Sequence, residues 1–407
     1  MFTDEEVASL GDYEIYVSSK SEEPTIRRYV VLDSLRGVCA CMVALLHFKT
    51  LGVISSSSFV NNSFLFVDFF FVLSGFVIAA SYGQRLRDGF SFRKFMLLRL
   101  GRVYPLHAFM LVVFLAFEIF ASFAAGLSDR TPFTGSYEPA LLAYSFLMLH
   151  TFLGPDGLPW NGPSWSIAVE VWTYVVFGLL FRFAGRWMLL MAGAIIVAAP
   201  IYLLFVTDRY LNVFHDGALV RCLYGFALGV FAHWLISKHR AVALSPIIFT
   251  LVEATAVIAV IWFVSVANAG PITLTAPWLF LAAILIFAQE GGYISRFLKI
   301  APMVFVGTLS FSIYMIHVFV QYRMFNVFSA LGNVLDVPLI ITVDGVKHLG
   351  YSPAFADIMS LAMLVIVIAL AWFSYEFVEE PGRKWSRRLL ISPRSSDATA
   401  ERTAPTF

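Results

Sequence analysis

Val31-Leu32-Asp33-Ser34-Leu35-Arg36 opens the first long apolar segment of the chain, and His47 closes it. In an α-helix each residue turns by about 100° and rises by about 1.5 Å, so the positions from Arg36 to His47 return to one face about 16 Å further along. Asp33, Arg36 and His47 therefore share a stripe. Charged and titratable side chains are costly in a bilayer-length helix and usually face a polar, functional interior. The alternative is an Arg that reaches the membrane surface and a His with a purely structural hydrogen bond.

The composition is that of an integral membrane protein. Of the 407 residues, 59% are hydrophobic and 14% are charged, whereas soluble domains carry about 25% charged residues. The three cysteines, Cys39, Cys41 and Cys222, lie in apolar segments and predict no disulfide framework. The sequence shows no Walker loop, no Cys/His cluster with metal-ligand spacing and no nucleic-acid signature. We therefore expect no metal site and no nucleic-acid partner.

The apolar segments predict an all-α integral membrane fold with about ten transmembrane helices. An additional segment, at roughly 139–151, is too short to span comfortably and is expected to be re-entrant or interfacial. The ten predicted spans lie at roughly 30–50, 64–82, 103–125, 163–183, 187–206, 217–236, 245–267, 273–288, 302–325 and 355–378.

The basic residues of the short connections predict the orientation in the membrane. Arg27-Arg28 place the N-terminus in the cytoplasm, and the connection 84–102 carries six lysines and arginines. The basic start of the C-terminal tail is cytoplasmic by the same rule. Two termini on one side require an even number of spans, which ten satisfies. The stretches 126–162 and 326–354 are then extracytoplasmic.

The chain divides into three predicted parts. Residues 1–28 are polar, lack the basic start and short apolar core of a signal peptide, and are expected to form a flexible cytoplasmic tail. Residues 29–381 form the transmembrane domain. Residues 382–407 are basic at first and then rich in Ser, Thr and Ala, which predicts a helix end followed by disorder in the cytoplasm.

A second candidate site lies on the fourth span. Ser166, Glu170 and Tyr174 follow one another at i, i+4 and i+8 on one helix face. A buried carboxylate needs a partner, or it becomes neutral, and either state suits proton transfer or the orientation of a histidine. The alternative is a hydrogen-bond network that only packs helices together.

Two more spans bring titratable groups to the depth of His47. Ser310, Tyr314 and His317 share a face of the ninth span, and Asp68 lies near the outer end of the second. His317 is able to bind substrate or relay protons, although a structural histidine remains a serious alternative. Asp68 is the residue of its segment that suggests a functional role, because the rest of the segment is typical of a helix that packs closely against others.

A pair of arginines enters the third span from the predicted cytoplasmic side. Arg99 and Arg102 are three residues apart and share a helix face, with Tyr104 just beyond them. Guanidinium groups suit phosphate and pyrophosphate. Arginines at this depth are also the ordinary topology signal and contact lipid phosphates, so the residues alone leave both interpretations open.

Together these motifs resemble those of the family-3 membrane acyltransferases, which include O-acetyltransferases of bacterial surface polysaccharides. The resemblance covers residues 29 to 381, and the motifs are far more specific together than singly. They are Leu32-Asp33-x-Leu35-Arg36-Gly37 followed by His47, Phe69 to Phe76, Arg99-x-x-Arg102, Trp165-Ser166-x-x-x-Glu170, Ser310-x-x-x-Tyr314-x-x-His317 and Tyr375-x-x-x-Glu379-x-Pro381.

The resemblance implies a cytoplasmic acyl donor, usually acetyl-coenzyme A as co-substrate, and a carbohydrate or glycolipid acceptor outside or at the membrane. It implies His47 as the catalytic residue with Arg36 as its companion, and Arg99 and Arg102 as donor contacts, to which we add Tyr104. We expect the bacterial inner (plasma) membrane as the location and make no prediction of oligomeric state. Some members carry an additional hydrolase-like domain, and we expect any such helper to be a separate protein.

The remaining motif residues are assigned by role. Glu170 and Asp68 join His47 as catalytic candidates, because either carboxylate is able to orient an imidazole. The residues expected to bind the acceptor or relay protons are Trp165, Ser166, Tyr174, Tyr314 and His317. Asp33, Ser310 and Glu379 are expected to support the site.

We therefore predict that an acyl group, most readily acetyl, moves from a thioester to a sugar hydroxyl. His47 acts either as a general base that deprotonates the hydroxyl, which we favour, or as a nucleophile that carries the acyl group. The rival class is a transporter or flippase for a glycolipid or organic anion, since buried charges on facing spans also suit carriers. No inverted repeat, which many carriers show, is apparent.

Overall fold

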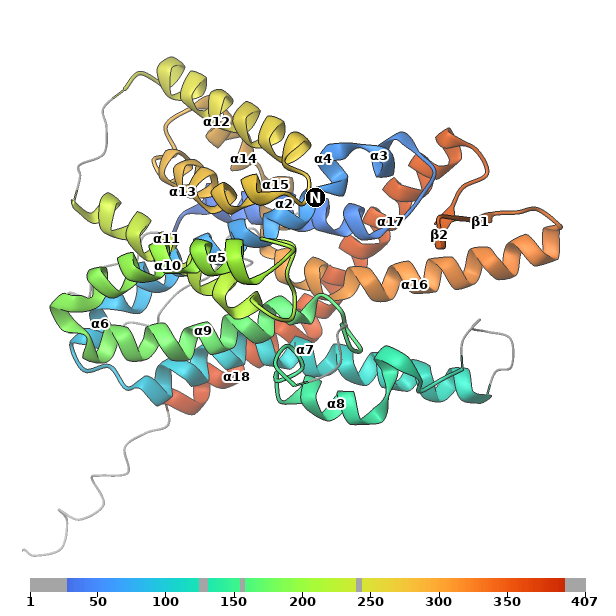
Figure 1. Cartoon of the computed structure of the whole chain (residues 1–407), viewed down its shortest axis with the longest axis horizontal. Coiled ribbons are helices and arrows are strands. Elements are labelled where there is room, and N and C mark those ends of the chain that lie inside the picture. Colours follow the sequence, from blue (N-terminus) through green and yellow to red (C-terminus); the bar gives the residue numbers. More distant parts are fainter. Residues whose placement is uncertain (1–27, 124–130, 154–157, 239–243, 392–407) are drawn as a thin grey trace, which may run out of the picture.

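Helices make up nearly all of the fold, because a chain inside a bilayer must satisfy its backbone polar groups internally. The computed structural model describes residues 28–123, 131–153, 158–238 and 244–391. Within these ranges it consists of helices and one two-stranded hairpin (Figure 1), which confirms the predicted all-α class. The predicted N-terminal tail up to residue 27, and the predicted disorder beyond residue 391, lie outside the described residues.

Eight helices among the described residues are long and apolar enough to cross a membrane. Each overlaps one of the predicted spans. They are α2 (Val30–His47), the run Ser63–Arg87 with α5 (Phe66–Ile78) and α6 (Gln84–Arg87), α7 (Phe92–Phe123), α9 (Ser164–Phe183), the run Gly185–Val206 with α10 (Met188–Val206), α11 (Ala218–Lys238), α12 (Pro246–Ala267), and the run Pro353–Leu389 with α17 (Pro353–Ser374) and most of α18 (Glu380–Ile391).

The other two predicted spans take different forms. The segment 302–325 is a broken pair, α15 (Ala301–Thr308) and α16 (Ser310–Leu335), bent by 67°. The segment 273–288 falls on the shorter apolar helix Pro271–Phe287, which includes α13 (Ala276–Phe287). Counting the bent pair as one span gives up to nine by length and composition. The number ten and the cytoplasmic placement of the termini therefore stay predictions.

Short elements connect the long helices. The predicted short segment 139–151 contains only α8 (Pro139–Phe146). The others are α3 (Val53–Ser56), α4 (Ser58–Asn61), α14 (Tyr293–Leu298), the 3-10 turns η1 (Ser63–Leu65), η3 (Gly135–Tyr137), η4 (Gly185–Trp187) and η5 (Pro271–Thr275), the π-helical turns η2 (Ala79–Gly83) and η6 (Tyr375–Glu379), and the strands β1 (Ile340–Val343) and β2 (Val346–Leu349).

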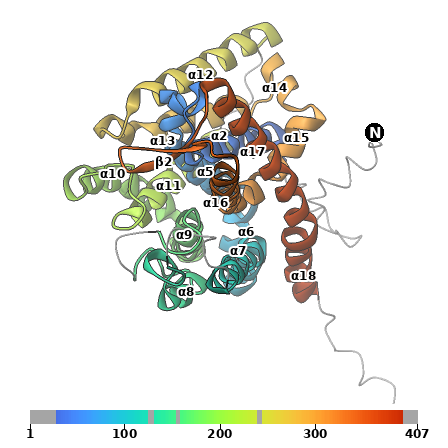
Figure 2. The same cartoon turned by 90° about the vertical axis from the view of Figure 1, so that its right-hand side faces the viewer.

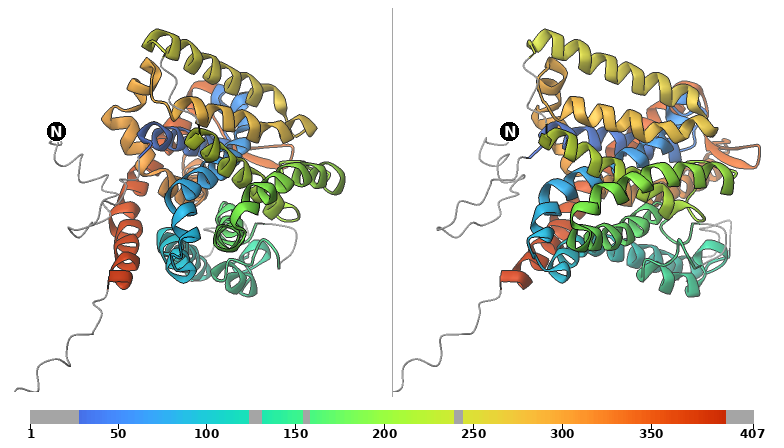
Figure 3. Two further views of the ribbon diagram at one scale, coloured as in Figure 1. Left: turned by 90° about the vertical axis from the view of Figure 1, so that its left-hand side faces the viewer. Right: turned by 60° about the vertical axis from the view of Figure 1, so that its left-hand side comes forward.

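The basic connections and the hairpin lie at opposite ends of the bundle. In Figure 1, α6 lies at the left and β1 and β2 at the right. Figure 2 looks from the hairpin side and shows α7, α9 and α16 nearly end-on, so these helices run roughly parallel. In the right-hand view of Figure 3, α18 (red) lies beside the start of α7 (blue), against which it packs. This arrangement suits the predicted topology, in which both basic segments face one side.

The hairpin lies directly over the end of α2. Its strands pair in antiparallel register, with Val343 opposite Val346, and the turn residues Asp344 and Gly345 both have positive φ, as a two-residue hairpin turn requires. An isolated parallel bridge joins Leu349 to Thr50. The chain just after His47 is therefore fixed to the hairpin.

Glycines allow the closest helix crossings. A Cβ on Gly229 of α11 would collide with the Val72 carbonyl of α5, and one on Gly75 with the Phe226 carbonyl. Gly37 of α2 and Gly307 of α15 meet in the same way. Small residues at such crossings let backbones pack tightly in membranes.

Candidate active site

His47 and His317 form an imidazole pair between α2 and α16. Their ring centroids are 5.0 Å apart, with an interplanar angle of 59°. Nδ1 of His47 lies 2.9 Å from the Val43 carbonyl oxygen. A carbonyl only accepts hydrogen bonds, so Nδ1 carries the proton and the neutral ring leaves its lone pair on Nε2. The His47 side chain is exposed, so a basic nitrogen is available at the predicted catalytic position.

His317 is enclosed, in contrast to His47. Its side chain is completely buried, and neither ring nitrogen has a hydrogen-bond partner among the described residues. The Tyr314 ring lies 5.8 Å away on the same helix, and Ser166 of α9 donates to the Tyr314 hydroxyl at 2.9 Å. The predicted faces of the fourth and ninth spans therefore meet here. Ser310, buried one turn before Tyr314, has no hydrogen-bond partner for its hydroxyl in the described part of the chain.

Glu170 belongs to a second network, one helical turn beyond Ser166 on α9. Its Oε1 accepts hydrogen bonds from Ser74 of α5 and Tyr174, both at 2.5 Å. Arg99 of α7 donates to the Tyr174 hydroxyl at 2.9 Å and lies over the Tyr174 ring. The predicted donor residue Arg99 and the predicted catalytic residue Glu170 are thus joined through one tyrosine.

Neither predicted orienting carboxylate contacts His47. Asp68 forms a two-pronged ion pair with Arg221 of α11, with Nε–Oδ1 at 2.9 Å and Nη2–Oδ2 at 2.7 Å. Both side chains are almost fully buried. The hypothesis that Asp68 or Glu170 orients the imidazole is therefore corrected, because each carboxylate is held by other donors and the Val43 carbonyl orients His47.

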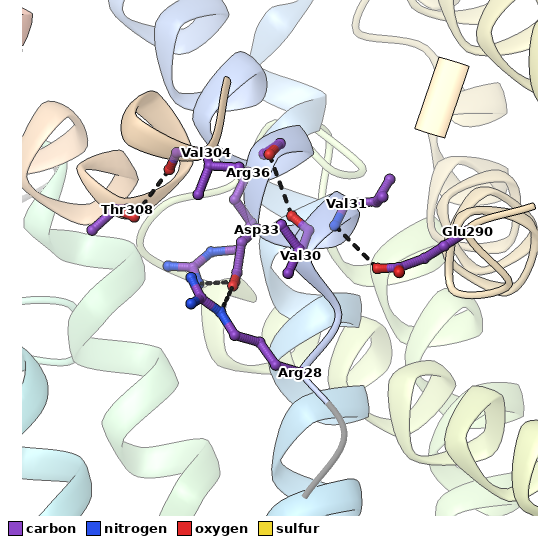
Figure 4. Close-up of polar contacts among 9 residues, drawn as sticks. Arg28, Val30, Val31, Asp33, Arg36, Glu290, Val304 and Thr308 are labelled. Atoms are coloured by element: carbon purple, nitrogen blue, oxygen red, sulfur yellow. Dashed lines mark hydrogen bonds and ion pairs between the residues drawn. The ribbon is translucent and has the colours of Figure 1, made fainter. Parts of the chain in front are cut away.

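A charge cluster occupies the opposite end of α2 from His47. Asp33 lies between two guanidinium groups, 3.2 Å from Nε of Arg28 and 3.4 Å from Nη1 of Arg36 (Figure 4). Glu290 accepts a hydrogen bond from the Val31 amide at 3.3 Å, at the start of the helix. Asp33 and Arg36 therefore form an ion pair on the helix face that they were predicted to share.

The closing motif reaches the same region. Glu379 is buried and accepts a hydrogen bond from Ser312 at 2.7 Å. The positive charges of Arg102, Arg383 and Arg36 all act on its carboxylate. Two predicted site residues, Arg36 and Arg102, together with Arg383 of the tail, therefore act on a third, Glu379, at the basic end of the bundle.

Two predicted residues have other surroundings. Trp165, expected near the acceptor, is buried against Phe71 and under the guanidinium of Arg221, 5.4 Å from its ring centroid. Tyr104, expected at the donor site, is exposed on α7. The structure thus joins Trp165 to the Asp68–Arg221 pair rather than to the imidazoles.

Sequence reasoning missed Arg221 and assigned no role to His150. Arg221 is an arginine within an apolar span, and the rule that flagged Asp68 would have flagged it too. His150 lies after α8 and stacks on His107 of α7, with centroids 6.2 Å apart. Burial, and then the neighbouring His107, lower the pKa of His150 to about 4.

An apolar helical bundle with an exposed imidazole and, at its basic end, a cluster of guanidinium groups is compatible with a membrane-embedded group-transfer enzyme. A family model described as an acyltransferase domain matches residues 29–373. The chain belongs to this family, family 3 of the acyltransferases, and the protein is an integral membrane acyltransferase.

Three relatives illustrate the similarity. Acyltransferase MdmB of Streptomyces mycarofaciens is 29% identical over 382 residues, which cover 88% of each chain. Protein 2 in the picA locus of Rhizobium radiobacter is 33% identical over 170 residues, 39% of this chain and 84% of that protein. O-acetyltransferase OatA of Staphylococcus aureus is 24% identical over 386 residues, 87% of this chain but only 57% of that protein. No solved structure matches the chain.

Proposed function

We propose that this acyltransferase moves an acyl group, acetyl in the simplest case, from acyl-coenzyme A on the cytoplasmic side to a hydroxyl of a carbohydrate or glycoconjugate. The observation that carries the proposal is the 2.9 Å contact between Nδ1 of His47, an exposed residue, and the Val43 carbonyl. From this contact we infer that Nδ1 carries the proton and Nε2 the lone pair. The relative named as an O-acetyltransferase supports acetyl as the group transferred. The protein would lie in the bacterial inner membrane with both termini in the cytoplasm.

The donor would bind at the basic end of the bundle. Arg36 and Arg102 act on one carboxylate there, and guanidinium groups suit the phosphates of coenzyme A. Arg36 lies about 16 Å below His47 along α2. The thioester therefore reaches His47 only if the extended pantetheine arm runs alongside this helix. By the same separation, Arg36 would bind the donor rather than stabilise the oxyanion at the reacting carbonyl.

In the favoured mechanism His47 is a general base. Nε2 takes the proton of the acceptor hydroxyl while the oxygen attacks the thioester carbonyl, and the proton then passes to the departing coenzyme A thiolate. The Val43 carbonyl holds Nδ1 protonated throughout. His317 lies in ring contact with His47, so its imidazole lies next to the positive charge that His47 gains on protonation.

The test uses purified protein in lipid nanodiscs with labelled acetyl-coenzyme A. His47→Ala and His47→Gln should abolish transfer and still insert and fold. His348→Gln is the matched control, because its ring bonds the Val346 carbonyl of the same strand. Full transfer by a folded His47→Ala variant would overturn the assignment, and flux of a glycolipid without any thioester would favour the transporter class.

Two measurements complete the assignment. Mass spectrometry of surface glycans and secreted metabolites, with and without the gene, should show a loss of one acyl mass that names donor group and acceptor together. Incubation with labelled acetyl-coenzyme A alone separates the two mechanisms: label on the protein that disappears in His47→Ala means an acyl-histidine, and no label means a general base.

A further inference from the structure

Lys49 follows the candidate catalytic histidine by two residues and is held in a fixed position. Its carbonyl accepts a hydrogen bond from the Leu349 amide of β2 at 3.0 Å, and the Leu51 amide donates back to Leu349 at 3.0 Å. The hairpin thus fixes the backbone on which Lys49 lies. The positive charge of Lys49 reaches the His47 imidazole. A cation therefore lies close enough to act electrostatically on the imidazole that we assign as the base.

This cation has no acidic partner within ion-pair distance in the part of the chain that the structure describes. Its ammonium group makes a long hydrogen bond, 3.4 Å, to the neutral Asn61 side chain. Asp357 packs against Gly52 in the same segment, but it accepts from the Ile54 amide at 2.9 Å and caps α3 instead.

The surroundings of Lys49 favour an anion. Its side chain is half-buried, and burial lowers the pKa of its ammonium below the ordinary value, because the charge has lost part of its hydration. A partly desolvated cation is stabilised by a negatively charged ligand.

We infer that the acceptor carries an anionic group, a carboxylate or a phosphate, which binds Lys49 while a neighbouring hydroxyl lies at His47. The inference rests on the proposed function, since it assigns the acceptor side of the same site. Lys49 is then a specificity residue: it selects acidic sugars or sugar phosphates over neutral sugars. Its interaction with the acceptor is formed before the chemical step and is weakened by salt.

The experiment compares matched acceptors on the full-length protein in nanodiscs. Methyl glucoside and methyl glucuronide differ only in the carboxylate, and glucose 1-phosphate adds the phosphate arm. With labelled acetyl-coenzyme A, the wild type should prefer a charged sugar by about tenfold in kcat/KM, the size of one charge-assisted hydrogen bond at a partly exposed site. Lys49→Gln should remove this preference through KM, and Lys49→Arg should retain it. Arg209→Gln is the control, because Arg209 is an exposed cation in the α10–α11 connection.

A binding measurement keeps the result independent of turnover. Each sugar is titrated while the thermal unfolding midpoint is followed, and only the charged sugars should stabilise the wild type more than Lys49→Gln. Stabilisation without acyl transfer would leave the anion site standing while the proposed function fails. Equal losses on neutral and charged sugars in Lys49→Gln would assign Lys49 to the reacting carbonyl or to folding and overturn the inference, as would equal stabilisation by all three sugars.

Discussion

The Asp68–Arg221 pair offers a direct test of whether a charge inside the bundle serves chemistry or structure. Arg221 donates two hydrogen bonds to Asp68 and two more to main-chain carbonyls, to Val213 at 3.2 Å and to Phe64 at 3.1 Å. The guanidinium also lies over Trp165. The perturbation is Arg221→Met alone, and then Arg221→Met combined with Asp68→Leu.

The magnitudes follow from what each variant leaves buried. Arg221→Met strands a carboxylate with no exposed surface, and breaking a buried pair in this way costs about 3–5 kcal/mol. In the double variant no charge remains. The loss is then limited to two hydrogen bonds to carbonyls, at about 1 kcal/mol each. The double variant should therefore be more stable than the single one by about 2 kcal/mol.

The assay is unfolding by SDS titration in mixed micelles, together with acyl transfer. If the pair is structural, the double variant regains both stability and most of its activity. If Asp68 takes part in the reaction, the double variant is stable but inactive, and our correction of its predicted role is wrong. A double variant as unstable as Arg221→Met would refute the reasoning about the buried charge.

Three further predictions concern separate parts of the molecule. The pKa of His150 is about 4 in the folded protein, against an ordinary value of 6.5, so only the unfolded chain takes up a proton between these pH values. About 3 kcal/mol of stability should therefore be lost as the pH falls from 6.5 to 4. The thermal unfolding midpoint of His150→Gln should fall less steeply with pH than that of the wild type, and an equal slope would contradict this prediction. Gly229→Ala should cost about 1–3 kcal/mol, because the added methyl group meets the Val72 carbonyl, whereas Gly193→Ala in α10, where nothing lies within 4 Å, should leave the unfolding midpoint unchanged or raise it. Tyr174→Phe removes the hydroxyl that joins Arg99 to Glu170. If this hydroxyl positions Arg99 for the donor, the KM for acetyl-coenzyme A should rise about fivefold, the effect of one hydrogen bond. An unchanged KM would count against a donor contact by Arg99.

The sequence was most informative where partners share a helix. Tyr174 and Glu170 are four residues apart on α9 and bond as their spacing predicted. Arg36 and Asp33 pair across one turn in the same way. Such contacts depend only on the helical repeat, which apolar segments of this length impose.

Contacts between helices could not be predicted in this way. Arg99 and Tyr174 are 75 residues apart in sequence, and Asp68 and Arg221 are 153 apart. Spacing within one helix says that a buried charge needs a partner, but the partner depends on which helices are neighbours. That is why His47 was assigned a carboxylate to orient it, when the carbonyl one turn earlier in its own helix does so.

The crossing of α5 and α11 shows how packing decides such partners. Gly225 and Gly229 follow Arg221 at i+4 and i+8, so the three residues share one face of α11. A side chain at either glycine would collide with α5, at Phe71 or at the Val72 carbonyl. The small residues therefore bring the two backbones together, and this close approach puts the guanidinium of Arg221 within hydrogen-bonding distance of Asp68, one turn before Val72. The packing motif and the buried ion pair are two parts of one interface, and neither is interpretable without the other.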